Sequence, residues 1–230
     1  WVSQVAPHWM QDWQANLAAI SAPGGINEPG PASLTGRSAG MVIDLQAAIS
    51  IFRDDPRIYN PVTYLFCGTL LLAWSVRTLR ARLTRQRAYL GLAAVAALSM
   101  LVTYHRPWDA KLLLLAIPAC AMLWAEGGRV RWIALPITAT GVLMTGDIPL
   151  AVCSILFNRL PISTAGFFAQ LLALLVIRPA SLILLAMGIF YLWMYLKCTE
   201  FDSAVVLAQA ISGGIIDARE DPLLNKSPRI

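Results

Sequence analysis

The sequence predicts an all-α protein, a polytopic membrane helix bundle. Three observations lead to this fold class. First, 57% of the 230 residues are hydrophobic and only 13% are charged, whereas a soluble domain carries about 25% charged residues. Second, apolar runs with the length of membrane helices alternate with short polar loops. Third, the arginines gather in those loops, which is typical of membrane topology and not of a face that binds nucleic acid.

The first segment, residues 1–60, is too polar to cross a membrane, and we expect an extracytoplasmic loop. Two amphipathic helices are predicted within it, over residues 11–21 and 41–52, separated by a loop rich in glycine and proline. Asp44 and Arg53 are expected on solvated faces of the second helix. The large apolar residues of the first helix recur at helical spacing, at Met10, Trp13, Leu17 and Ile20.

A transmembrane bundle is predicted over residues 61–197. Its apolar spans are residues 61–76, 88–104, 110–125, 132–157 and 179–196. With a rise of about 1.5 Å per residue, the first span reaches about 24 Å and needs flanking residues to cross a core of about 30 Å. Residues 160–178 are also long enough to span, but we expect a helix in the outer interface, ended by Arg178 and Pro179.

Arginines set the predicted orientation of these spans. Residues 77–87 contain five arginines and no acidic residue, so this short loop is predicted to be cytoplasmic. The loop over residues 126–131 has two arginines and agrees with that assignment. Residues 1–60 and the turn at 105–109 then share the outer face, and residues 198–230 are expected to form a loose cytoplasmic tail.

A polar turn between two uncharged runs carries the strongest functional signal. Its residues with useful chemistry are Tyr104, His105, Arg106, Asp109 and Lys111. Polar groups at such a junction are costly unless they face water, a partner or a substrate. Histidine exchanges protons near neutral pH, and the cations suit a phosphate at the level of the lipid headgroups. The sequence therefore predicts an anion site on the outer face, with Asp109 orienting His105.

The same residues also have a purely structural interpretation. Asp109 would cap the following helix, while Arg106 and Lys111 would extend to the lipid headgroups. Asp147, in the outer part of the fourth span, either faces the same cavity or caps a helix that is broken at Gly146. The four cysteines lie in or at the end of apolar runs without paired spacing, and no metal site is predicted.

Residues 104–114 resemble a known family. They are similar to the C-terminal half of the bacterial integral-membrane glycosyltransferases of family 87, which have a GT-C fold. The matching features are a Tyr-His pair at the outer end of a span, an aromatic-Asp pair and a leucine-rich helix. Residues 143–147 and 190–193 are similar as well. The resemblance implies a partial GT-C-type fold with extracytoplasmic amphipathic helices, over about residues 1–197.

The resemblance also implies an activity. Such a hexosyltransferase moves a mannose-type sugar from a polyprenyl-phosphate donor to a lipid or glycan acceptor on the outer face of the inner (cytoplasmic) membrane. We expect His105 and Asp109 to be the catalytic residues. The donor phosphate is expected at Tyr104, Arg106, Lys111 and Asp147. No cofactor is expected, and the expected partners are the donor, the acceptor and membrane lipids, with no nucleic acid.

The general base of such enzymes is an acidic side chain in the first outer loop. Since the chain begins at Trp1, we expect that loop to lie upstream and this fragment to be inactive by itself. Two other functions remain open on the sequence. A transporter or flippase-like protein for lipid-linked saccharides would bind the same headgroup without chemistry, and a structural membrane subunit would use the turn only to anchor helices.

Overall fold

The computed structural model describes residues 2–22, 27–30, 42–80, 82, 84–102, 105, 107–146, 148–149, 151–152, 155 and 166–217. Within these ranges the regular secondary structure is helical and there is no strand, which confirms the all-α class. The elements are α1 (Val2–Val5), α2 (Trp9–Ser21), α4 (Leu45–Ser50), α5 (Pro56–Arg80), α6 (Arg85–Val102), the 3-10 helix η1 (Pro107–Leu115), α7 (Ala116–Glu126), α8 (Arg131–Met144), α10 (Phe167–Ile177) and α11 (Pro179–Asp217).

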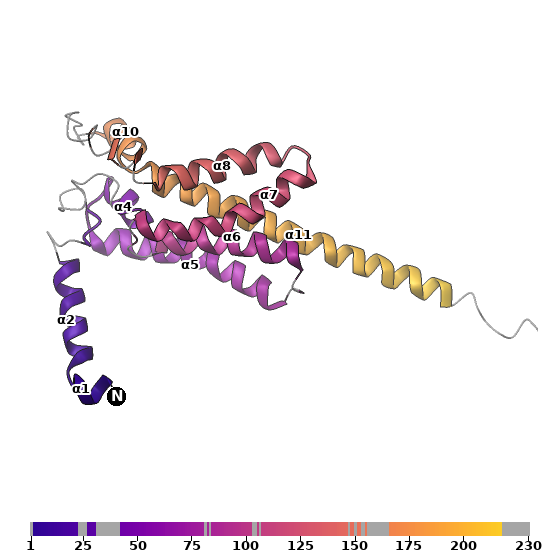
Figure 1. Ribbon diagram of the computed structural model, residues 1–230, viewed down its shortest axis with the longest axis horizontal. Coiled ribbons are helices and arrows are strands. Elements are labelled where there is room, and N and C mark those ends of the chain that lie inside the picture. Colours follow the sequence, from indigo (N-terminus) through magenta and orange to yellow (C-terminus); the bar gives the residue numbers. More distant parts are fainter. Residues whose placement is uncertain are drawn as a thin grey trace, which may run out of the picture.

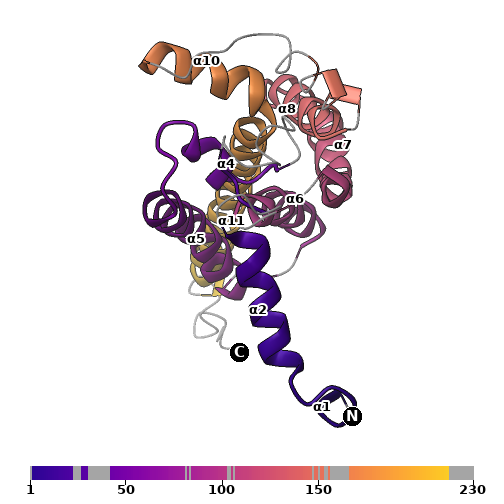
Figure 2. The same ribbon diagram turned by 90° about the vertical axis from the view of Figure 1, so that its left-hand side faces the viewer.

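Helix α6 lies at the centre of an elongated bundle (Figures 1 and 2). It packs against α5, η1 and α7, and most extensively against α11. The contact face of α6 is rich in alanine, and small side chains allow two helix backbones to approach closely. Opposite this face, a Cβ atom added to Gly188 of α11 would lie only 2.7 Å from Cδ2 of Leu98. The seam between α6 and α11 is therefore the core of the molecule.

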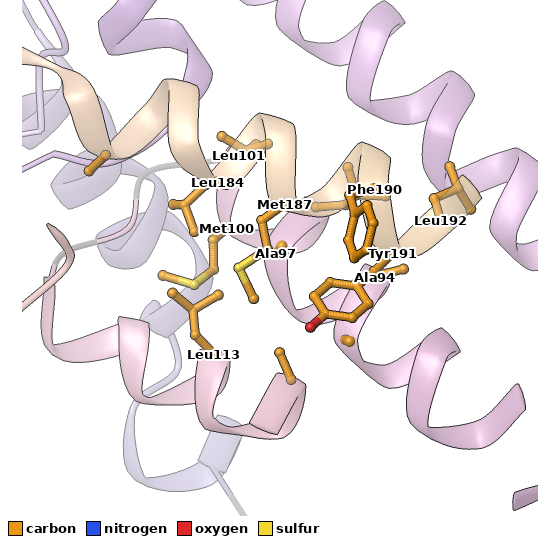
Figure 3. Packing of buried hydrophobic residues seen from close by; sticks show 14 of the residues in the cluster. Ala94, Ala97, Met100, Leu101, Leu113, Leu184, Met187, Phe190, Tyr191 and Leu192 are labelled. Carbon is orange, nitrogen blue, oxygen red and sulfur yellow. The ribbon is translucent and has the colours of Figure 1, made fainter. Parts of the chain in front are cut away.

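Larger side chains fill the core where this seam meets η1. Met100 and Leu113 point toward Leu184 and Met187 of α11 (Figure 3), and all four are fully buried. Tyr191 continues the same buried row along α11, and its hydroxyl forms a hydrogen bond with the hydroxyl of Thr138 on α8. Four elements of the bundle are thus held together by one continuous apolar cluster.

The two ends of the bundle differ. We call the end with α4 the outer end (residues 42–60, 105 and 178–184) and the end with the α5–α6 connection the inner end (residues 74–92, 124–132 and 195). Helices α2 and α10 lie across the long axis of the bundle at the outer end (Figures 1 and 2). At the inner end, the last part of α11 projects beyond the other helices (Figure 1).

Two of the described helices are long and apolar enough to cross a membrane, Pro56–Arg80 and Pro179–Cys198. Residues that flank the first predicted span do join it, because α5 has 25 residues and reaches about 37 Å. Its outward face is apolar, with exposed side chains at Val62, Tyr64, Leu65, Phe66 and Leu72. Arg131–Met144 and Phe167–Val176 are apolar but shorter.

Several predicted segments have different bounds in the structure, and the span predicted at 132–157 is one of them, because α8 ends at Met144. The span predicted at 110–125 is divided between η1 and α7, and nothing in the run of leucines at 112–115 explains the tighter helix. The helix predicted at 41–52 is shorter, because Asp44 caps α4 at its start. The prediction of a loose tail from residue 198 is wrong as far as Asp217. Residues 199–212 contain neither proline nor glycine and are rich in alanine, which favours continuation of α11.

Candidate functional site

The predicted site residues are only partly within the described chain. Tyr104, Arg106 and Asp147 lie outside the described residues. Asp109 and Lys111 are exposed on η1, and Asp109 lies in its first turn. An acidic side chain is favourable at this position, because the first N–H groups of a helix carry partial positive charge. His105 is half-buried at the outer end.

A segment distant in sequence holds the backbone of His105. Ile43 donates a backbone hydrogen bond of 3.2 Å to the carbonyl oxygen of His105. Val42 and Ile43 are themselves buried, at 1% and 0% exposure. The polar turn is therefore anchored to the interior of the bundle by residues that precede α5.

Asp44 follows these two residues, and its environment differs from the prediction. We expected Asp44 on a solvated helix face, but it is 1% exposed. Its Oδ1 atom accepts a hydrogen bond of 2.7 Å from the backbone N–H of Ala47, which caps α4. The apolar residues on both sides draw this cap into the core. Arg53, by contrast, is exposed as predicted.

Arg178 is the second buried charge at the outer end, at 2% exposure. Its Nη1 atom donates to the carbonyl oxygen of Val42 at 3.1 Å, and its Nη2 atom donates to that of Pro29 at 3.4 Å. The Ser50 hydroxyl donates to the same Pro29 carbonyl at 3.0 Å. One guanidinium group therefore ties two segments of the N-terminal region to the start of α11.

Sequence reasoning used Arg178 only as the end of a helix and missed this role. A signal was present: a single arginine closes the uncharged run over residues 164–177, and a single aspartate follows Val42 and Ile43. Charges beside long apolar runs tend to pair with one another. Pairing these two isolated charges would have placed Arg178 near the segment that contains Val42 and Asp44.

Burial dominates the electrostatics of both groups. It raises the pKa of Asp44 from 3.8 to about 6, while the hydrogen bond from Ala47 and the charges of Arg178 and His105 act in the opposite direction. Burial also lowers the pKa of Arg178 to about 10, against the effect of the Asp44 charge. An acid that titrates near neutral pH therefore lies close to His105. Perturbed carboxyl groups of this kind are frequent at functional sites.

Several buried polar atoms at the outer end make no hydrogen bond to the described residues. Oδ2 of Asp44, Nε of Arg178 and Oγ of Ser181 have no hydrogen-bond partner among the residues that the structure describes. Buried polar atoms are nearly always paired with protein, water or ligand. We call Asp44, His105 and Arg178 the outer polar cluster. It combines a proton-exchanging acid, an imidazole and a permanent cation.

No protein-family model matches the chain, and no curated protein or solved structure matches it. Within the described ranges, no group of three or more His, Cys, Asp or Glu side chains is arranged to hold a metal ion. The chemistry available at the outer polar cluster is hydrogen bonding to an anion at the half-buried His105 and proton exchange at Asp44, while Arg178 donates to backbone carbonyl groups.

Proposed function

We propose that this chain is part of a glycosyltransferase with a multi-pass helix bundle of GT-C type in the inner (cytoplasmic) membrane. It transfers a hexose from a polyprenyl-phosphate donor to a lipid or glycan acceptor on the outer face. One observation carries the proposal. The turn that resembles family 87 enzymes is held in place by a buried segment, and that segment brings a titratable carboxyl group and a guanidinium group close to His105.

The arrangement of the helices supports a membrane location. Two helices have the length and apolar character of spans, and the arginine-rich connection lies at one end of the bundle. The positive-inside rule makes that end cytoplasmic. Helices α2 and α10 lie across the other end (Figures 1 and 2), as helices in a membrane interface do. The exposed apolar residues of α2 include Trp9, Trp13 and Leu17.

The reaction needs groups that act on the donor phosphate and on the acceptor hydroxyl. The acceptor oxygen attacks the anomeric carbon, the bond from this carbon to the phosphate oxygen breaks, and the phosphate leaves with the electron pair. His105, with Arg106 and Lys111 of the same turn, stabilises the charge that develops on the phosphate. The acceptor proton passes to a general base, which the resemblance assigns to an acidic side chain of the first outer loop.

Asp44 and Arg178 act as positioning residues in this proposal. Their side chains are too buried to meet a sugar, and they hold the residue 42–44 segment against the backbone of His105. Asp109 is exposed within the turn and is available to orient the imidazole or to accept a hydrogen bond from a substrate hydroxyl. Tyr104 and Asp147 keep the donor-binding roles that the resemblance implies.

His105→Ala tests the proposal in the full-length protein in membrane vesicles, with a polyprenyl-phosphate sugar as donor. We expect loss of sugar transfer of at least about 100-fold, the usual contribution of a group that stabilises a charged leaving group. Expression and membrane insertion should stay unchanged. The chain contains one other histidine, His8, which is exposed next to α2, and His8→Ala is the matched control.

Wild-type transfer by His105→Ala would overturn the assignment of this residue. A wild-type protein that binds the donor but never transfers its sugar would overturn the enzyme proposal. That second result would favour the transporter for lipid-linked saccharides. Such a protein would bind the lipid-linked saccharide through the polar groups of the outer end without transferring the sugar.

A further inference from the structure

A cavity of about 310 Å³ lies at the inner end of the bundle, between α5, α6 and α11. It is at the opposite end from the outer polar cluster. The residues around it include Trp74, Thr78, Arg82, Arg87, Leu92 and Tyr195. No acidic side chain is among the described residues that line it. A cavity of this size is large enough for a small polar group.

Hydrogen bonds hold the walls of this cavity in place. The hydroxyl groups of Thr78 and Tyr195 are 2.9 Å apart, and the indole N–H of Trp74 donates to the carbonyl oxygen of Gly91 at 3.0 Å. A Cβ atom at Gly91 would already lie 3.4 Å from Nε1 of Trp74 and 3.5 Å from Cε2 of Tyr195. The glycine thus lets both aromatic side chains close on α6. The walls are formed before any ligand arrives.

Two arginines give the cavity its charge. Arg87 is 5% exposed, and its Nη1 atom donates to the backbone carbonyl of Arg82 at 2.8 Å. This bond holds the backbone of residue 82 at the mouth of the cavity, where the Arg82 side chain is exposed. Guanidinium groups bind phosphate oxygens through two parallel N–H donors. The cavity therefore combines positive charge with hydroxyl groups, and none of the described residues that line it is acidic.

Apolar surface continues from the same site along the outside of the bundle. Leu92 lines the cavity and is 44% exposed, and Leu79 on the neighbouring helix is 87% exposed. Trp74 and Tyr195 stand at this level, and Tyr89 lies one turn away on α6. Tryptophan and tyrosine concentrate where the hydrocarbon of a membrane meets the headgroups. A ligand in the cavity would have its charged group beside the arginines and its apolar chains along the leucines.

We propose that this cavity binds the phosphate group of an anionic lipid from the cytoplasmic leaflet. The anionic lipids of that leaflet attract basic segments close to the membrane surface. A soluble phosphate compound shares the same charged group but leaves the apolar surface beside Leu92 uncovered. The site is independent of sugar transfer, because it lies at the end of the bundle away from the polar turn.

Binding is tested with the full-length protein in nanodiscs of phosphatidylcholine that contain a small fraction of phosphatidylglycerol. Lipids retained after gentle release are counted by native mass spectrometry. We expect retention of phosphatidylglycerol over phosphatidylcholine, and a decrease of about fivefold on Arg82→Gln, the effect of about one cation near an anionic surface. Arg129→Gln removes the same charge from an exposed position at the same end and should retain the lipid.

Arg87→Gln should have a larger effect than Arg82→Gln, and Thr78→Val provides a variant without a change of charge. If Arg87→Gln does not fold, Arg87→Lys keeps the charge and removes the paired donors, and weaker retention is again expected. Equal losses on Arg82→Gln and Arg129→Gln would overturn the proposal, because binding would then follow net charge. Displacement by millimolar inorganic phosphate, with no preference for phosphatidylglycerol, would overturn the lipid assignment in favour of a soluble phosphate compound.

Discussion

The outer and inner ends of the bundle hold their arginines in opposite ways. At the outer end, Arg178 is buried, donates hydrogen bonds to two distant carbonyl groups and lies within electrostatic reach of Asp44. At the inner end, Arg80 and Arg129 are exposed and keep their hydration. A buried charge costs several kcal/mol unless the fold satisfies it, whereas an exposed one costs little. The same residue type is therefore a buried, hydrogen-bonded group at one end and a hydrated surface group at the other.

Arg87 shows that position at the inner end does not by itself decide exposure. It is buried beside a cavity, unlike most arginines of the same connection. The contrast between the ends is one of surroundings. An arginine side chain is buried where backbone carbonyl groups accept hydrogen bonds from its guanidinium group. Elsewhere the side chain stays in water.

The largest effect is expected on removal of the buried cation. Arg178→Met should lower the free energy of unfolding by about 3–5 kcal/mol, because the carbonyl groups of Val42 and Pro29 lose their donor and Asp44 loses a nearby positive charge. Chemical unfolding in detergent micelles measures this change. Arg129→Met is the control at the inner end and should change stability by less than about 0.5 kcal/mol. Similar losses for both variants would remove the distinction between the two ends.

The next effect concerns the dependence of stability on pH. The pKa of Asp44 is about 6 in the folded protein, against 3.8 for an ordinary aspartate. A raised pKa means that the fold favours the protonated carboxyl group. Its contribution is complete below about pH 4 and is lost as the pH rises through about 6, with a total of about 3 kcal/mol.

Asp44→Asn keeps a side chain that caps α4 and cannot ionise. Unfolding measured between pH 4 and pH 8 should therefore show a smaller loss of stability in Asp44→Asn than in the wild-type protein. Asp12→Asn, at an exposed position on α2, should leave the wild-type slope unchanged. If the free energy of unfolding of Asp44→Asn still falls with pH as steeply as that of the wild-type protein, the pH dependence belongs to another group.

The smallest effect is expected at an exposed polar contact of the inner end. The side chain of Gln86 donates to Glu126 at 3.0 Å and joins α6 to the end of α7. Both groups are accessible to water, which replaces the lost hydrogen bond. Gln86→Ala should lower the free energy of unfolding by less than about 0.5 kcal/mol in the same unfolding measurement. A loss above about 2 kcal/mol would show that the inner end also depends on its polar contacts.

Much of the helical framework was predictable because its causes are local. Pro179 ends one helix and begins the next, and the uncharged runs over residues 62–76 and 179–196 indicate the two helices that are long enough to cross a membrane. The turn that contains His105 was also visible, since a cluster of polar residues between apolar runs is unusual in any fold. Periodicity and composition depend only on neighbours in the chain. Helices that follow from them can therefore be predicted without knowledge of the packing.

The surroundings of His105 could not be predicted in the same way. Arg178 and the carbonyl group of Val42 are 136 positions apart in the chain, and only the packing of α4 against α11 brings them together. Asp44 was predicted on a solvated face of the helix expected at residues 41–52. It is instead buried between apolar residues, within electrostatic reach of Arg178, which lies between α10 and α11. The sequence by itself determined most of the helices, their order and the position of the polar residues around His105. Tertiary structure decided which charges are buried and paired, because desolvation depends on every segment that surrounds a side chain.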